Sequence, residues 1–129
     1  MKIPGIVIAA SASGSGKTAV TMAMMKAFKN AGKKVRACKC GPDYIDPMFH
    51  REVLGIDSEN LDLYFCDRER LKERFMHHAE GAELVVTEGV MGYYDGISLD
   101  SDQASTYDVA RTLGLPLILV VWHRQSWQY

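Results

Sequence analysis

The sequence predicts an α/β fold, in which helices cover both faces of a parallel sheet. Three apolar runs rich in Ile, Val and Leu alternate along the chain with segments of helical periodicity. Each run is continuously apolar, which is typical of strands buried on both faces. A chain of 129 residues has room for one domain.

The elements follow one another as strand, loop and helix. The predicted strands are residues 3–10, 34–39, 84–87 and 117–121. The predicted helices are residues 18–31, a short helix from Asp46 to Gly55, one from Asp67 to about Ala79, and one from Ser105 to Gly114. In the first helix the apolar positions at helical spacing, which predict its buried stripe, are Val20, Ala23, Met24, Ala27, Phe28 and Ala31.

Capping residues mark the ends of these helices. Asp46 before Pro47 is typical of an N-cap followed by the first helical position. Asp67 and Ser105 stand at equivalent places before the two later helices. Gly114 is a typical C-terminal stop. The helix boundaries are therefore predicted by local chemistry as well as by periodicity.

The composition excludes several classes of partner. Fifteen Lys and Arg against sixteen Asp and Glu give a net charge of -1, without the basic surplus that favours nucleic acid or an anionic membrane. The longest apolar run, residues 115–122, is too short to span a bilayer. Three cysteines, an odd number without the paired spacing of a zinc site, favour free buried thiols in a reducing cytoplasm.

A loop rich in Gly and Ser joins the first strand to the first helix. Residues 11–18, Ser-Ala-Ser-Gly-Ser-Gly-Lys-Thr, end as a P-loop ends, in the strand-loop-helix context that this motif requires. Lys17 is expected to reach the terminal phosphates of ATP, and the Thr18 hydroxyl to ligate Mg²⁺. The backbone N–H groups expected to surround the phosphates belong to Ser13, Gly14, Ser15 and Gly16. The sequence therefore predicts a P-loop NTPase, although Ser11 replaces the usual first glycine and an ordinary turn is the alternative.

Carboxylates follow two of the predicted strands. Glu88 comes directly after the strand of residues 84–87, where P-loop proteins present an acid to Mg²⁺. Asp43 and Asp46 lie in the loop after the second strand, at the same predicted edge, and Asp46 is equally consistent with an N-cap alone. Lys39 ends the second strand and could contact phosphate or carboxylate oxygens, or be a solvated surface lysine. For His50, local packing is favoured over a role in the site.

Three blocks resemble a known family. They are residues 40–50, Cys-Gly-Pro-Asp-Tyr-Ile-Asp-Pro-Met-Phe-His, residues 60–62, Asn-Leu-Asp, and residues 88–96, Glu-Gly-Val-Met-Gly-Tyr-Tyr-Asp-Gly. With these, residues 3–121 resemble the N-terminal ATP-binding domain of the cobyrinate a,c-diamide synthase family. The chain is more distantly similar to dethiobiotin synthetase, which shares the fold.

The resemblance implies an ATP-dependent amidoligase of cobalamin biosynthesis. Such an enzyme phosphorylates the a and c acetate side chains of cobyrinic acid, or of a related tetrapyrrole, and ammonia then displaces the phosphate. By motif, Asp43 and Glu88 match the metal-binding acids, and Lys39 matches a lysine on the phosphate side. The positions that match residues near the substrate carboxylate are Tyr44, Asp46 and Asp95, of which Asp95 is expected, with Lys17, to be catalytic.

The chain departs from the family after the last strand. The family has an aspartate there, whereas this chain has Trp122, so residues 1–121 are expected to be a partial ATP-binding domain and residues 122–129 an atypical tail. The glutamine amidotransferase domain that supplies ammonia in the family is absent from these residues. The sheet is then expected to have an exposed edge with uncovered apolar surface.

Other functions remain as alternatives. A nucleotide switch of the partitioning-ATPase type would act through dimerisation, but its additional lysine near the start of the loop is missing here. A homodimer is a possible assembly. Dethiobiotin synthetase activity is disfavoured by the Gly-Pro-Asp-Tyr-Ile-Asp-Pro block of residues 41–47.

Overall fold

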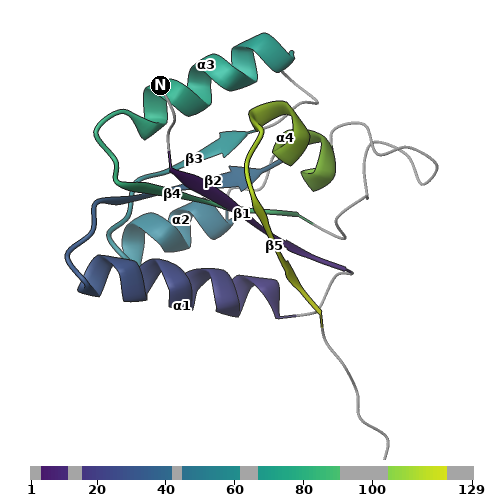
Figure 1. The fold of residues 1–129 in the computed structure, drawn as a ribbon. Coiled ribbons are helices and arrows are strands. Elements are labelled where there is room, and N and C mark those ends of the chain that lie inside the picture. The colour runs from purple at the N-terminus through teal and green to yellow at the C-terminus, as the bar shows by residue number, and fades with distance from the viewer. Residues whose placement is uncertain (1–3, 12–15, 42–44, 62–66, 91–104, 122–129) are drawn as a thin grey trace, which may run out of the picture.

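The computed structural model describes residues 4–11, 16–41, 45–61, 67–90 and 105–121. These residues form one sheet of five strands in the order β3-β2-β4-β1-β5, in which every neighbouring pair is parallel (Figure 1). The strands are β1 (Gly5–Ala10), β2 (Val35–Cys40), β3 (Ser58–Leu61), β4 (Leu84–Glu88) and β5 (Leu117–Val120). The predicted α/β class is confirmed.

Helices lie on both sides of the sheet. They are α1 (Lys17–Asn30), α2 (Ile45–Glu52), α3 (Arg68–Ala79) and α4 (Thr106–Leu113). Helices α1 and α2 cover one face, and α3 and α4 cover the other (Figure 1). Because each helix leads from the end of one parallel strand back to the start of another, its N-terminus lies at the edge where the strands end. We call this the carboxyl edge.

Alternation along the strands divides the core in two. Cys38 and Cys40 of β2 pack with Leu71 and Phe75 of α3 on one face. The intervening Ala37 packs with Met25 of α1 on the other face. Side chains of neighbouring strand residues point to opposite faces, so Lys39 shares the α1 face with Ala37. Cys38 and Cys40 are free and buried, as predicted.

The predicted caps are largely confirmed. The Asp67 carboxylate accepts a hydrogen bond from the Arg70 N–H at 2.8 Å, and the Ser105 hydroxyl accepts one from the Asp108 N–H at 3.1 Å. Gly114 ends α4 in the left-handed conformation. Asp46 is not an N-cap, because α2 begins one residue earlier, at Ile45.

The buried stripe of α1 differs from the predicted one. Thr21 and Met25 are the buried residues, whereas Val20 is 36% exposed. The Thr21 hydroxyl donates to the Lys17 carbonyl within the helix, so its burial leaves no donor unsatisfied. A polar residue can therefore belong to the buried face, and Met24 of the predicted stripe is partly buried against the same cluster as Met25. The prediction that His50 packs locally is confirmed. This residue is fully buried, and its Nδ1 lies 2.8 Å from the Ser58 hydroxyl oxygen.

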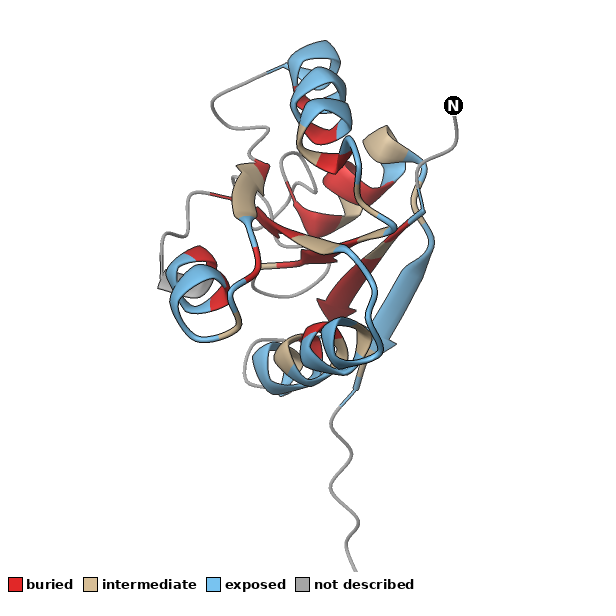
Figure 2. Cartoon of the chain, turned by 90° about the vertical axis from the view of Figure 1, so that its left-hand side faces the viewer, coloured by how far each residue is buried: buried red, intermediate tan, exposed pale blue. Residues whose placement is uncertain are grey.

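The two edge strands were predicted less well. Strand β3 was not predicted, because its sequence, Ser-Glu-Asn-Leu, has no apolar run. For strand β5 the apolar run alone predicted burial on both faces, whereas a partial domain predicted an exposed edge. Leu117, Ile118 and Leu119 are 37%, 38% and 47% exposed. Figure 2 shows the contrast between this strand and the buried central strands. The expected exposed edge with uncovered apolar surface is therefore confirmed in the described residues.

Candidate functional site

The start of α1 has the properties of an anion site. Gly16 precedes the helix with a φ of 85°, a left-handed conformation that favours glycine. No described side chain caps this helix, and its first turn holds no acidic residue. The N–H groups and the positive end of the dipole at a helix N-terminus favour a bound phosphate. Ser13, Gly14 and Ser15 lie outside the described residues.

A buried ion pair lies in the sheet beside this helix. Lys39 and Glu88 are register partners on β2 and β4. The Lys39 Nζ lies 2.8 Å from the Glu88 Oε2, and the two residues are only 1% and 0% exposed. The interpretation of Lys39 as a solvated surface lysine is therefore wrong. Pairing repays part of the large cost of removing both charges from water.

The Gly89 carbonyl connects this pair to the P-loop. Lys39 donates to that oxygen at 2.8 Å, and the Lys17 ammonium donates to the same oxygen. The Gly89 N–H donates to the Ile8 carbonyl of β1 at 2.8 Å. Two cations from two elements therefore meet at one carbonyl beside one carboxylate, at the carboxyl edge.

The site has room for glycine alone at position 89. A Cβ added there would lie 2.6 Å from the Thr106 Cγ2 and 3.1 Å from the Ile8 carbonyl oxygen. The Thr106 hydroxyl lies 3.0 Å from the Val90 nitrogen, from which it accepts a hydrogen bond, so α4 is fixed against this turn. Sequence reasoning did not select Gly89, because a shared carbonyl acceptor leaves no signature in the side chains.

Cys40 lies near the same charges but is not a nucleophile. Burial raises the pKa of its thiol to about 12, although Lys39 and Lys17 act in the opposite direction. A thiol with this pKa is protonated at neutral pH and is therefore unreactive.

The donors present suit a magnesium ion. Glu88 offers a carboxylate, and Thr18 is exposed on the first turn of α1, so both supply the hard oxygen ligands that Mg²⁺ prefers. Within the described part of the chain, no group of three His, Cys, Asp or Glu side chains could hold a metal. Asp43, Tyr44 and Asp95 lie outside the described residues, and Asp46 is described by its backbone alone.

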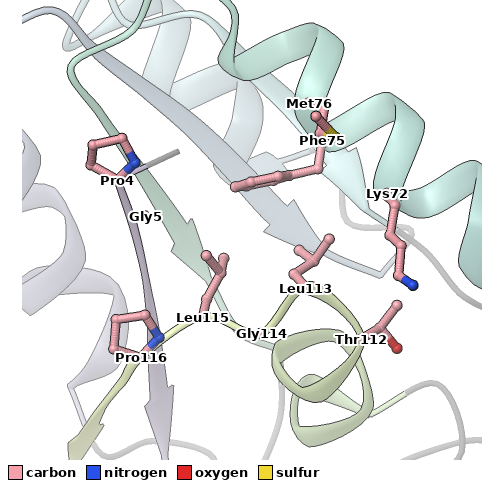
Figure 3. Close-up of a pocket in the computed structure, with 10 residues that line it drawn as sticks. All are labelled: Pro4, Gly5, Lys72, Phe75, Met76, Thr112, Leu113, Gly114, Leu115 and Pro116. Carbon is pink, nitrogen blue, oxygen red and sulfur yellow. The ribbon is translucent and has the colours of Figure 1, made fainter. Parts of the chain in front are cut away.

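A separate cavity lies away from this cluster. It has a volume of about 560 Å³ and is mostly apolar, with Phe75, Leu113 and Leu115 directed into it (Figure 3). Pro4 and Pro116, which precede β1 and β5, also line it. These residues place the cavity at the opposite end of the strands from Lys17, so it is not part of the candidate site.

The fold and the cluster define a P-loop α/β domain with a nucleotide site at its carboxyl edge. Residues 6–118 match the family model described as the CobQ/CobB/MinD/ParA nucleotide binding domain. The chain belongs to this family.

Among the described residues, no helix combines the length and the apolarity that crossing a membrane requires.

Within this family, the chain is similar to curated proteins named as a,c-diamide synthases. The chain is 49% identical over 116 residues to a cobyrinate a,c-diamide synthase of Gloeobacter violaceus, covering 90% of this chain and 26% of the relative. It is 46% identical over 121 residues to the enzyme of that name from Thermoplasma volcanium, covering 94% and 26%. A hydrogenobyrinate a,c-diamide synthase of Streptomyces coelicolor is 46% identical over 119 residues, covering 92% and 24%. The chain thus spans about a quarter of the length of these relatives.

Proposed function

We propose that this chain is the ATP-binding portion of an amide-forming ligase that activates the a and c acetate carboxylates of cobyrinic acid or of a closely related tetrapyrrole. The observation that carries the proposal is the meeting of Lys17 and Lys39 at the Gly89 carbonyl, beside Glu88. The names of the curated relatives support the choice of substrate.

The reaction needs a leaving group on carbon. A carboxylate is a poor acceptor of ammonia until one of its oxygens has been phosphorylated, and the resulting acyl phosphate loses phosphate when ammonia attacks. Transfer of the γ-phosphoryl group requires that its negative charge be neutralised and its position fixed. In the proposal, Lys17 and the N-terminus of α1 neutralise the terminal phosphates, and Lys39 adds a second cation from β2.

Glu88 and Thr18 are the described residues that would hold Mg²⁺, together with Asp43 by resemblance. The ion would neutralise charge on the phosphate oxygens. The Lys39 ammonium, 2.8 Å from the Glu88 Oε2, would orient this carboxylate. The donor set is thus prepared before the nucleotide binds. Tyr44, Asp46 and Asp95 are proposed to contact the substrate carboxylate.

Ammonia is proposed to come from a glutamine amidotransferase domain outside residues 1–129. Residues 1–121 would be the partial amidoligase domain, with residues 122–129 outside it. We place the reaction in the cytoplasm, where ATP is available and where the free Cys38 and Cys40 would remain reduced. A homodimer is a possible assembly.

The test supplies free ammonium, so that amide formation does not depend on a glutamine amidotransferase domain. The chain is incubated with MgATP, ammonium and cobyrinic acid, and ADP and the corrin products are measured by mass spectrometry. Cobyrinic mono- and diamides formed together with ADP are the expected result. The full-length Gloeobacter relative, assayed in parallel, shows that the reagents are competent. If ADP forms at the same rate with and without cobyrinic acid and no amide is produced, a nucleotide switch is favoured instead.

A further inference from the structure

A second cluster of charges joins the first turns of α3 and α4. Asp108 of α4 is only 1% exposed. The Arg68 Nη2 lies 2.8 Å from its Oδ1 and 3.1 Å from its Oδ2, and the Arg111 Nη2 lies 2.9 Å from its Oδ1. Both arginine side chains are 53% exposed. One buried carboxylate therefore holds two guanidinium groups that remain open to solvent.

This cluster carries more positive charge than its structural role requires. A single arginine would neutralise Asp108, yet two are bound to it. The other acids at the start of α3 are occupied elsewhere: Asp67 caps the helix, and the Glu69 carboxylate lies 3.6 Å from the Lys72 ammonium. Together, the two guanidinium groups and Asp108 keep a net positive charge.

The position of Arg68 opposes the dipole of α3, a cost that its ion pair with the buried Asp108 offsets. This arginine is the first residue of α3, where the positive end of the helix dipole disfavours a cation by about 0.3–1 kcal/mol. Arg68 bonds Asp108 through Nη2, and its Nη1 and Nε have no partner among the described residues. These N–H groups lie on different edges of the guanidinium, so each can donate a single hydrogen bond to a ligand oxygen. Asp108 fixes the guanidinium in advance, which lowers the entropy lost on binding.

The cluster and the phosphate lysines lie on opposite faces of the sheet. Lys39 lies on the α1 face, whereas Arg68 and Asp108 belong to the helices on the other face. Both sets of charges lie at the carboxyl edge, where α1, α3 and α4 begin. A ligand that contacts both must be large and must carry several anionic groups. A tetrapyrrole acid meets this requirement, because its carboxylates are distributed around the rim of the macrocycle.

We infer that Arg68 and Arg111 bind a peripheral carboxylate of the tetrapyrrole substrate, one that is not being phosphorylated, and that Asp108 positions both arginines. This inference rests on the proposed function and extends it, since it assigns part of the substrate recognition to the α3 and α4 face.

The test compares cobyrinic acid with its fully methylated ester, which keeps the macrocycle and lacks the carboxylate charges. Calorimetric titration of the chain with both compounds is repeated for Arg68→Gln and Arg68→Lys. Arg74→Gln is the matched control, because Arg74 lies on the same helix, is 51% exposed and pairs with the Glu59 carboxylate at 2.9 Å. The free energies of unfolding of all variants are measured alongside.

Arg68→Gln is expected to weaken the binding of cobyrinic acid about tenfold and to leave the ester and MgATP unaffected. Arg68→Lys should recover only part of the loss, since it restores the charge without the planar guanidinium that Asp108 holds in place. Equal affinities of Arg68→Gln and the wild type for cobyrinic acid would overturn the inference alone. A loss of MgATP affinity instead would also overturn it and assign Arg68 to phosphate. Failure of the wild type to bind cobyrinic acid would overturn the proposed function and the inference together.

Discussion

The ammonium of Lys39 and the carboxylate of Glu88 lie 2.8 Å apart inside the sheet, at positions that pair in register across β2 and β4. Glu88 is the acid expected to approach the metal, and Lys39 is the cation expected to approach phosphate. The two residues are therefore coupled before any ligand binds, so a change in either one should alter the other.

Lys39→Met should lower the free energy of unfolding by about 3 kcal/mol, because it leaves the Glu88 carboxylate buried without its ammonium partner. The double variant Lys39→Met with Glu88→Gln should recover much of this loss, since no buried charge remains. Urea unfolding of the four proteins measures the coupling. Additive losses in the double variant would contradict the assigned pair.

Lys17→Ala should weaken nucleotide binding about a hundredfold, because Lys17 supplies a charge at the terminal phosphates. Its free energy of unfolding should change by about 1 kcal/mol for the lost hydrogen bond to the Gly89 carbonyl, because the side chain is only half-buried. Calorimetric titration with MgATP measures the effect. Lys26→Ala, an exposed lysine of the same helix, is the control and should bind as the wild type does. Full affinity of Lys17→Ala would refute the P-loop assignment.

Gly89→Ala should destabilise the chain by about 1–3 kcal/mol, because the added methyl group meets the Thr106 Cγ2 and the Ile8 carbonyl. Thr106→Ser in the same chain removes the nearer contact and keeps the hydroxyl, so it should recover part of the loss. Thermal unfolding checks both variants. If Gly89→Ala were as stable as the wild type, the close approach of β4, β1 and α4 at this turn would be disproved.

The stability of the chain should fall at high pH partly through Cys40. Burial raises the pKa of this thiol from 9.0 to about 12, so the folded state retains a proton that the unfolded state releases. Its contribution is complete below pH 9.0 and is lost as the pH rises toward about 12, at up to about 1.4 kcal/mol per pH unit. The difference in unfolding free energy between the wild type and Cys40→Ala should therefore shrink across this range. A constant difference would contradict the burial of the thiol.

The uncovered strand β5 should make the chain prone to association. Ile118 and Leu119 are 38% and 47% exposed, and β5 is an edge strand of the described sheet. Leu119→Lys should reduce concentration-dependent association in analytical ultracentrifugation. Lys26→Glu on exposed α1 is a control for altered charge and should have no such effect. Equal association of all three proteins would assign the contact to another surface.

Local features of the fold could be predicted from the sequence. Asp67, Ser105 and Gly114 act on backbone groups a few residues away, so their neighbours in the sequence suffice to identify them. Strand β3 could not be predicted, because its polar residues form a strand only by pairing with β2.

The candidate site was predicted only in part. The residue types at positions 17, 39 and 88 indicated phosphate and metal chemistry, but not that Lys39 bonds a carboxylate 49 residues away. That contact depends on the register of two strands that are distant in the sequence. The Arg68 and Asp108 pair was missed for the same reason, since these two residues are 40 positions apart in the sequence and lie on different helices.

The most direct test of the proposed function follows the phosphate itself. ATP labelled with ¹⁸O in the β,γ-bridge is incubated with the chain and Mg²⁺, with and without cobyrinic acid and in the absence of ammonia. Reversible formation of an acyl phosphate should move the label to the non-bridging β-phosphate positions only when cobyrinic acid is present, and Lys17→Ala should abolish this exchange. No exchange with cobyrinic acid, or the same exchange without it, would contradict the proposal that this site phosphorylates a tetrapyrrole carboxylate.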